Sequence, residues 1–245
     1  IWNHMQVVST LAGARIGGGP AFLRVQIGGV QEFIAQARNT RDLWSGSYLN
    51  SWLIVAGLKA LSERVGPDAV IFPNLLGQPL FDLRWRDEIW ANQSAKPNQT
   101  KNAWETFDHS DRDLLTPNFP NVFLALVPAD QSAALGQLVD DAIRDEFRDI
   151  SDCVWHQART AGIVTDADKA RFSDQIARAL NISWQAQPWP ADLDAACSLA
   201  KDAPAGSPLA TAADRVSMIR DLAERAMPAA HRDWRYYVCS SESSH

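Results

Sequence analysis

The residues best suited to chemistry lie early in the chain, where a pair of glycines separates two regular patterns. Gly28 and Gly29 follow an alternating stretch over 22–27 that predicts a β-strand, and a helical pattern begins at Val30. A glycine turn between a strand and a helix N-terminus presents free backbone N–H groups that can bind a phosphate. Because no lysine accompanies the glycines, this phosphate signal is weak, and a simple tight turn is the more economical interpretation.

Two arginines and an aspartate follow on the expected helix. Arg38, Arg41 and Asp42 recur at steps of three or four residues, which places them along one side of a helix. Their guanidinium groups can contact phosphate or pair with the neighbouring carboxylate. We favour the ion pair, since it needs no ligand.

Other polar clusters in the sequence have simpler explanations than catalysis. His109-Ser-Asp111 lacks the Gly-x-Ser-x-Gly turn that presents a nucleophilic serine in many hydrolases, so we expect a polar loop. Asp140 with Asp141, and Asp166 with Asp168, could bind a cation, but the helix dipole also favours acidic residues near helix starts. We therefore assign none of these residues to a catalytic or metal site.

Tryptophan is unusually frequent, with 10 in 245 residues. The indole ring can stack on nucleobases, but several of these residues fall on apolar faces at helical spacing, where core packing is the expected role. The tryptophans considered for stacking are those at positions 44, 52, 155, 184, 189 and 234.

The overall composition bounds the class of protein. Hydrophobic residues make up 46% and charged residues 21%, as in folded globular proteins, which excludes a disordered chain. The formal net charge of −6 excludes a uniformly basic surface for nucleic acid, although it allows a local patch.

No apolar run reaches the roughly 18–20 residues that cross a bilayer and no signal-peptide pattern is present, so we expect a cytoplasmic protein without membrane contact. Cys153, Cys197 and Cys239 are widely spaced and fit reduced thiols.

Hydrophobic periodicity predicts alternating strands and helices. Strands are expected at 22–27, 69–72, 121–127 and 182–187. Helices are expected over 30–65, 130–154 and 166–180. The first of these is a long helix or a broken pair, weakest at 45–47, the second is capped by Asp130, and the third by Thr165 or Asp166. A further extended piece is expected at 80–83, within a region that continues as a surface insertion over 86–120.

The order strand, helix, strand, strand, helix, strand is typical of the split β-α-β fold. We therefore predict an α+β protein with a ferredoxin-like βαββαβ domain, a long first helix and additional C-terminal helices. The expected organisation is a leader or linker over 1–21, the ferredoxin-like domain over 22–190 and a helical extension over 191–245. This fold carries many unrelated functions, so it does not identify one.

The segment around the glycine turn resembles one protein family. Ile27-Gly-Gly-Val-Gln-Glu-Phe-Ile-Ala-Gln-Ala-Arg38 resembles the Ile-Gly-Pro-Val-Gln-x-Phe-Ile-x-x-Ala-Arg signature of the large polymerase/cyclase-like subunit of type III-B CRISPR (Cmr) effector complexes. Gly29 departs from the usual proline, which leaves a more flexible turn. The likeness covers about 22–190 in order and includes Thr40-Arg-Asp-Leu-Trp-Ser-Gly-Ser47, Ser51-Trp-Leu53, Val70-Ile-Phe-Pro-Asn74 and Pro120-Asn-Val-Phe-Leu-Ala-Leu-Val-Pro128.

The resemblance implies that this segment is the first of two palm domains. In that family the intact subunit converts ATP to cyclic oligoadenylates with divalent metal ions, Mg or Mn, when the complex binds target RNA. The implied partners are the other type III-B subunits, the guide RNA and the target RNA, and the first palm would contribute backbone and side-chain contacts to ATP. The residues expected to face that nucleotide-binding cleft are Gly28, Gly29, Gln31, Arg38, Arg41 and Ser45.

The family's catalytic motifs do not occur in this sequence. There is no Gly-Gly-Asp-Asp, whose acidic residues hold the metal ions, and no His-Asp pair of the kind an HD nuclease needs. The family's zinc insertion begins with Cys-x-x-Cys, whereas this tail offers only Cys239 and His245, too few for a four-ligand zinc site. The chain looks like a piece of a longer protein, and we expect it to be inactive alone and not to bind zinc.

Two functions therefore stay open on the sequence. The first is a palm that contributes to a cleft for ATP binding and cyclic oligoadenylate synthesis. The second is a non-catalytic docking module that binds other CRISPR subunits and RNA without nucleotide. The acidic balance and the missing metal carboxylates favour the second function for the chain taken alone.

Overall fold

The computed structural model describes residues 2–16, 18–29, 35, 37–86, 88 and 111–189. The chain divides into two compact units, Ile1–Pro188 and Trp189–His245. Only Trp189 of the second unit belongs to the described residues. The predicted helical extension over 191–245 lies outside them.

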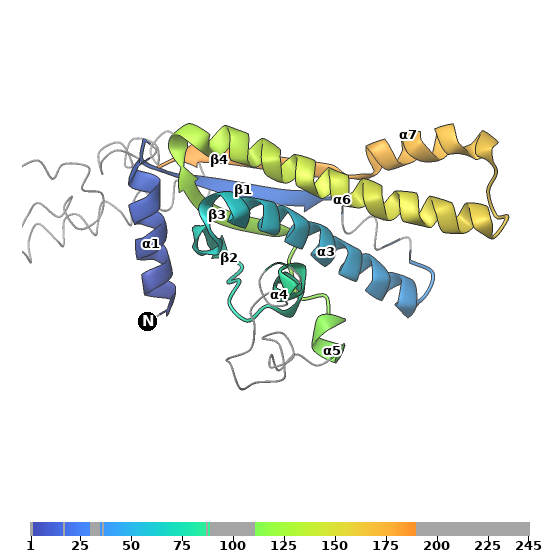
Figure 1. Cartoon of the computed structure of the whole chain (residues 1–245), viewed down its shortest axis with the longest axis horizontal. Helices are drawn as coiled ribbons and strands as arrows, with labels where there is room; N and C mark the ends of the chain where they lie inside the picture. Colours follow the sequence, from blue (N-terminus) through green and yellow to red (C-terminus); the bar gives the residue numbers. More distant parts are fainter. Residues whose placement is uncertain are drawn as a thin grey trace, which may run out of the picture. The chain divides into compact units, whose positions relative to one another are not determined.

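A four-stranded antiparallel sheet forms the centre of the first unit (Figure 1). Its spatial order is β2-β3-β1-β4. The strands are β1 (Pro20–Gly28), β2 (Val70–Phe72), β3 (Val122–Pro128) and β4 (Asn181–Pro188). Helix α3 (Thr40–Val65) lies between β1 and β2 in the chain, and helix α6 (Ser132–Thr160) follows β3. This is the βαββαβ connectivity, so the predicted α+β, ferredoxin-like fold is confirmed.

The hydrophobic core lies between the sheet and helices α3 and α6. β1 alternates between buried and partly exposed positions, as the sequence pattern predicts for a strand with one buried face. The two helices approach closely at Gly57, where a Cβ atom would lie only 2.9 Å from Val139 Cγ1. Fully or nearly fully buried core side chains include Leu23, Val25, Ile27, Leu53, Ile54, Leu58, Leu61, Phe123, Val127, Val139 and Ile143.

Helix α3 begins about ten residues later than its periodicity predicted. Asn39 has an extended backbone, with φ −153° and ψ 171°, and its Oδ1 accepts a hydrogen bond from the Asp42 backbone N–H at 3.0 Å. This N-cap fixes the start of α3 at Thr40. Ala35 is helical, but residues 30–34 and 36, where the helix was predicted to begin, lie outside the described residues. From Thr40 the helix continues through Gly46, so the weak point predicted at 45–47 is not a break. The described residues 37–39 are not helical and separate Ala35 from α3.

A second difference concerns the segment predicted to be extended at 80–83. Residues Pro79–Arg84 form helix α4, in which Leu80 and Phe81 are buried. Pro79 stands in the first turn of α4, where the missing backbone N–H has no intrahelical partner to lose. A short apolar run is compatible with either structure, and here the proline decides for the helix.

Helix α1 (Trp2–Ile16) lies within the segment expected to be a leader or linker. Gln6 Nε2 donates a hydrogen bond to the Val70 backbone oxygen, and Thr10 Oγ1 donates one to the Asp68 backbone oxygen, each at 2.6 Å. These bonds attach α1 to the start of β2. Hydrophobic periodicity carries no information about such contacts, which explains why the pattern did not predict this helix.

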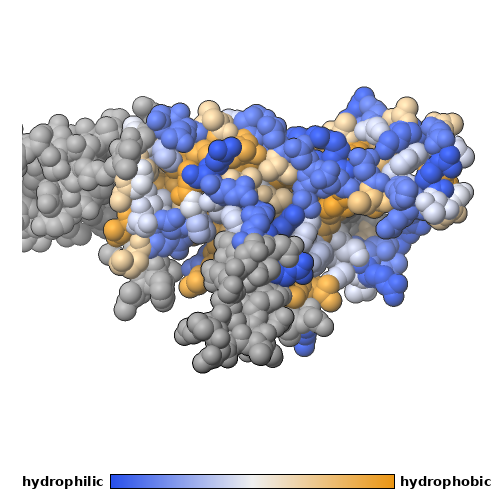
Figure 2. Space-filling view, in the orientation of Figure 1, coloured by the Kyte–Doolittle hydropathy of each residue, from blue (hydrophilic) through white to orange (hydrophobic). Residues whose placement is uncertain are grey.

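The end of α6 and helix α7 (Lys169–Ala179) form a hairpin that extends beyond the strands (Figure 1). Hydrophilic side chains cover much of this hairpin (Figure 2). Thr165 and Asp168 form a reciprocal capping box before α7, in which the Thr165 backbone N–H donates to Asp168 Oδ2 at 2.9 Å. The N-cap predicted at Thr165 is therefore confirmed. The cap predicted at Asp130 is wrong, because Gln131 precedes α6 without a side-chain cap.

Two carboxyl groups make the α6–α7 connection sensitive to acid. Two hydrogen bonds from the Arg159 guanidinium, each 2.8 Å long, lower the pKa of Asp166, and hydrogen bonds from Thr165 lower the pKa of Asp168. The ionised carboxylates therefore stabilise the connection above their unfolded pKa of about 3.9, and this stabilisation is lost as the pH falls through the lower folded-state pKa. We expect the ¹³Cα shifts of the first turn of α7 to lose helical character between about pH 6 and about pH 2.

Two substitutions provide the comparison for this titration. Asp168→Asn should reproduce part of the acid state near neutral pH, because it removes the carboxylate that accepts from Thr165. Asp174→Asn, on the exposed side of the same helix and paired with Arg178 one turn away, should leave the first turn unchanged. Helical shifts that persist at acid pH in the unmodified chain would contradict the prediction.

Candidate functional site

The glycine turn lies at the end of β1 and is fixed by two asparagines from neighbouring strands. Asn121, just before β3, forms two hydrogen bonds with the backbone of Ile27. Its backbone oxygen accepts from the Ile27 N–H, and its side-chain Nδ2 donates to the Ile27 oxygen, each at 2.9 Å. Gly28 pairs with Asn181 of β4, and a Cβ on Gly28 would lie 3.1 Å from Asn181 Nδ2. Gly29 has φ +71°, a conformation that L side chains rarely adopt. The backbone conformation therefore favours glycine at position 29, and a side chain at position 28 would need Asn181 to shift.

Polar side chains of β1 and β4 lie on the face of the sheet opposite the core, beside this turn. Arg24 and Gln26 of β1 alternate with the buried residues, and the Arg24 guanidinium donates a hydrogen bond to Gln26 Oε1. Arg24 stands in register with Leu124 of β3 and Gln185 of β4. This outer face combines one cation with amide and apolar groups, which suits a ligand that carries both a flat ring and negative charge.

Arg24 and Gln26 did not stand out in the sequence. The signal that could have found them is the alternation over 22–27, because every second residue of a strand with a buried face must point away from the core. Since the glycine turn follows the same strand, the outward-facing positions nearest to it are the natural candidates. The glycine motif marks the turn and not the strand that precedes it.

The remaining predicted site residues form a separate group at the start of α3. Arg38, Arg41 and Ser45 are exposed there, and Figure 1 shows the first turn of α3 apart from the end of β1. The Arg38 backbone N–H, not its guanidinium, donates to Asp42 Oδ2 at 3.2 Å. Among the described residues neither arginine side chain forms an ion pair, so the expected pairing with Asp42 is wrong. Gln31 lies outside the described residues.

Three aromatic rings form a stack along α3, which we name the aromatic stack: Trp44, Tyr48 and Trp52. The ring centroids of Trp44 and Tyr48 are 5.4 Å apart, and those of Tyr48 and Trp52 are 6.3 Å apart. The interplanar angles are 25° and 15°, so the three rings are nearly parallel. A spacing of four residues brings side chains onto the same helix face, which aligns the rings. Core packing, predicted for the tryptophans, is confirmed for Trp52 but not for the exposed Trp44.

Arg84 of α4 and Glu146 of α6 close the inner end of the aromatic stack. Arg84 Cζ lies 4.0 Å from the centroid of Trp52, and its Nη2 lies 2.7 Å from Glu146 Oε1. Trp52 Nε1 donates a hydrogen bond to the same carboxylate oxygen at 2.6 Å. Arg84 Nη2 and Nε are buried without a hydrogen-bond acceptor in good geometry, so the contact with Glu146 is an ion pair only. Burial raises the pKa of Tyr48, against an opposing effect of the Arg84 charge.

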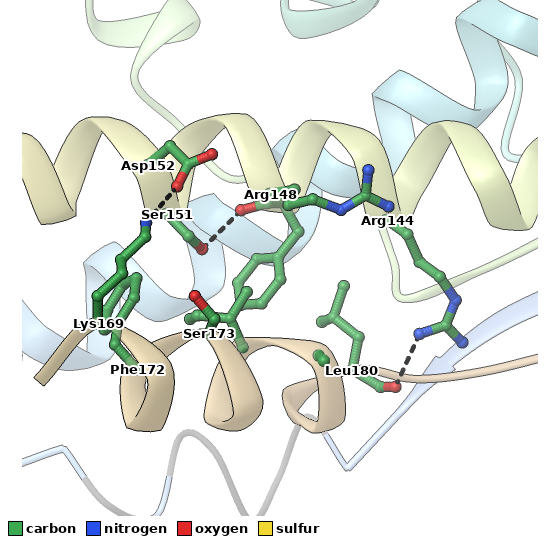
Figure 3. A pocket seen from close by; sticks show the side chains of 11 residues that line it. Arg144, Arg148, Ser151, Asp152, Lys169, Phe172, Ser173 and Leu180 are labelled. Carbon is green, nitrogen blue, oxygen red and sulfur yellow. Dashed lines mark hydrogen bonds and ion pairs between the residues drawn. The ribbon is translucent and has the colours of Figure 1, made fainter.

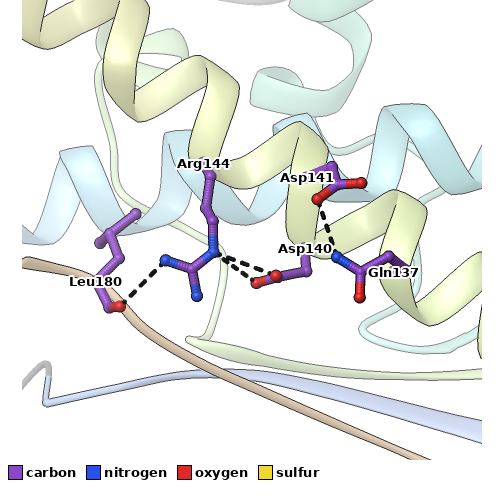
Figure 4. A network of polar contacts seen from close by, with 5 residues as sticks. All are labelled: Gln137, Asp140, Asp141, Arg144 and Leu180. Carbon is purple, nitrogen blue, oxygen red and sulfur yellow. Dashed lines mark hydrogen bonds and ion pairs between the residues drawn. The ribbon is translucent and has the colours of Figure 1, made fainter. Parts of the chain in front are cut away.

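A cavity of about 440 Å³ separates the second half of α6 from α7 (Figure 3). Its three cationic side chains already have partners. Lys169 Nζ lies 2.9 Å from Asp152 Oδ1, and Arg148 Nη1 lies 2.8 Å from Asp145 Oδ1. Arg144 binds Asp140 at 3.1 Å and reaches the Leu180 backbone oxygen at 3.5 Å (Figure 4). These internal pairs make the cavity a poor anion site.

The acidic pairs that the sequence analysis considered take part in local hydrogen bonds. Asp140 accepts from Arg144, and Asp141 accepts from Gln137 Nε2 at 2.9 Å (Figure 4). Within the described ranges no three His, Cys, Asp or Glu side chains lie together as a metal site would require. In the same part of the chain, no helix combines the length and apolar character that a membrane span requires. The tail residues Cys239 and His245 lie outside the described residues.

Comparison with known proteins gives concordant matches. Residues 22–152 match the family model described as CRISPR-associated protein Cmr2, N-terminal. The chain is 30% identical over 145 residues to the CRISPR system Cmr subunit Cmr2 of Pyrococcus furiosus, which covers 59% of this chain and 14% of that protein. It is 45% identical over 47 residues to the CRISPR system CMR subunit Cmr2 of Saccharolobus solfataricus, covering 19% of this chain and 4% of that protein. The chain thus spans only a small part of the length of these relatives.

Proposed function

Because the chain belongs to the Cmr2 N-terminal family, we propose that it forms part of the large subunit of a type III-B CRISPR effector complex. Its partners in this proposal are the other Cmr subunits and, through the complex, the guide RNA and the target RNA. The match over 22–152 supports this assignment, since it includes β1, α3 and β3, the elements that build the centre of the fold. RNA-guided defence of this kind would take place in the cytoplasm.

We further propose that the sheet acts as the first palm of a nucleotide-binding cleft for cyclic oligoadenylate synthesis. The observation that carries this proposal is the glycine turn at the end of β1 beside an outer sheet face with an exposed arginine. Backbone N–H groups at the turn and the Arg24 guanidinium can bind phosphate oxygens, and the neighbouring Gln26 can bind a base or ribose. The Gly-Gly-Asp-Asp motif and the divalent metal belong, in this proposal, to another part of the intact subunit.

The decisive experiment substitutes Arg24 in the intact complex. A hydrogen bond between charged groups contributes about 1.5–3 kcal/mol, so Arg24→Ala should lower cyclic oligoadenylate synthesis at subsaturating ATP by about ten- to a hundredfold. Arg64→Ala is the matched control, because Arg64 is also an exposed arginine but lies in the last turn of α3 and not on the sheet. This substitution should leave synthesis unchanged. The product is measured from labelled ATP after target RNA is added.

A second arm of this experiment separates the two functions considered for the chain. If Arg24→Ala leaves product formation unchanged, the nucleotide role of this face is wrong. An Arg24→Ala complex that fails to assemble would instead favour the docking function, in which the same face contacts another subunit. Size-exclusion chromatography of both variant complexes distinguishes these results.

A further inference from the structure

The aromatic stack is closed at one end and open at the other. At its inner end the planar guanidinium of Arg84 lies over Trp52. At its outer end Trp44 is 42% exposed, and among the described residues no ring other than Tyr48 stacks on it. A stack of parallel rings that already accepts one planar group can accept a second planar group on its free ring.

The rings also line an open cavity of about 440 Å³, within the size range of small-ligand sites. Leu49 of α3, Leu83 of α4 and Ile150 of α6 complete its apolar wall. Ser45 contributes a hydroxyl group to the same lining. A flat, largely apolar ring with a few polar edge atoms fits this combination.

Two arginines come shortly before Trp44 in the chain, on the side of the open end. Arg41 precedes Trp44 and Ser45 by three and four residues, so it lies on the same side of α3 as the aromatic stack. Arg38 lies just before the helix, and neither side chain forms an ion pair among the described residues. Five other arginines of the described region, by contrast, form ion pairs: Arg84, Arg144, Arg148, Arg159 and Arg178.

We propose that Trp44 stacks on a nucleobase whose phosphate is bound by Arg41 and Arg38. Aromatic side chains beside cationic groups are the usual means of binding single-stranded nucleic acid, and stacking tolerates any base. This inference rests partly on the proposed function, because Arg38, Arg41 and Ser45 were expected in the nucleotide-binding cleft. The nucleotide can come from single-stranded RNA or from a free mononucleotide.

The test measures binding by the whole 245-residue chain. The probes are a fluorescently labelled octaadenylate RNA, followed by anisotropy, and AMP, followed by calorimetry. Trp44→Ala should weaken binding by about tenfold or more, whereas Trp44→Phe should retain most of it. Leu43→Ala is the matched control, since Leu43 is also 42% exposed and neighbours Trp44 on the helix.

A second variant tests the phosphate contact. Arg41→Gln should weaken RNA binding and reduce the slope of log affinity against log salt by about 0.7, the value for one phosphate of a single strand. If a variant loses RNA binding while AMP binding is unaffected, the stacking site is specific for RNA; if it loses both, the site accepts any nucleotide. Equal affinities for Trp44→Ala and Leu43→Ala, or no binding by the unmodified chain, would overturn the proposal and leave the cavity to an apolar protein contact.

These results can be separated from those of the proposed function. Trp44 lies on α3, and Arg24 lies on the outer face of β1. If Arg24→Ala lowers cyclic oligoadenylate synthesis while Trp44→Ala leaves RNA and AMP binding intact, only the stacking inference fails. The reverse result would retain the stacking site and refute the nucleotide role of the sheet.

Discussion

Replacing Phe123 by alanine should lower the free energy of unfolding by about 3–5 kcal/mol. Phe123 is 0% exposed in the central strand β3, in register with the equally buried Val25 of β1. Truncation removes the apolar ring from the core between the sheet and helices α3 and α6. The surrounding side chains are closely packed and cannot move far enough to fill the cavity that remains. The expected result is a large shift of the urea midpoint at an unchanged slope.

The neighbouring residue on β3 provides the control. Val122 is only half-buried and lies on the outer face of the sheet. Val122→Ala should therefore cost less than about 1 kcal/mol. If both substitutions cost the same, Phe123 would not hold the central position in the core that its burial indicates.

Replacing Glu146 by alanine should lower the free energy of unfolding by about 2–3 kcal/mol. The substitution leaves the Arg84 guanidinium, whose side chain is only 18% exposed, without its acidic partner. It also removes the acceptor of the Trp52 Nε1 hydrogen bond. The expected loss is below that of a fully buried pair, because Glu146 is 21% exposed and water can partly solvate the remaining charge.

Two further variants assign this effect to its causes. Glu146→Gln keeps an oxygen for Trp52 but removes the charge, so it should cost less than Glu146→Ala. Asp145→Ala breaks an ion pair on the same helix, with Arg148, in which both side chains are more than half exposed. That pair should contribute less than about 1 kcal/mol. A loss for Asp145→Ala as large as that for Glu146→Ala would contradict the interpretation.

The strands and the fold could be predicted because their signal is local. Alternation over 22–27 and the apolar run at 121–127 predict β1 and β3, and both occur with one or two residues of difference at the ends. The start of α3 could not be predicted in this way, because apolar residues continue at helical spacing before it. The extended backbone of Asn39 and the bond from its side chain to Asp42 decide where the helix begins.

The candidate site could be predicted only in part. The glycine pair is visible in the sequence, and the positive φ of Gly29 gives the pattern a physical reason. The grouping of Arg38, Arg41 and Ser45 with those glycines depended on a helix that starts immediately after the turn. Because α3 starts at Thr40, Arg41 and Ser45 lie in its first two turns, and Ser45 lines the cavity beside the aromatic stack. The four-residue spacing of Trp44, Tyr48 and Trp52 was present in the sequence, but exposure of the first ring depends on how far α3 projects.

The sheet order has a consequence for the time course of synthesis. β1 lies between β3 and β4, which begin at Val122 and Asn181. At about 5–20 residues per second, a ribosome completes β1 roughly 5–20 s before β3 begins and roughly 8–30 s before β4 begins. During that interval both edges of β1 lack their strand partners. The period in which a nascent chain of this protein needs protection by chaperones is therefore set by its topology and not by the stability of the finished fold.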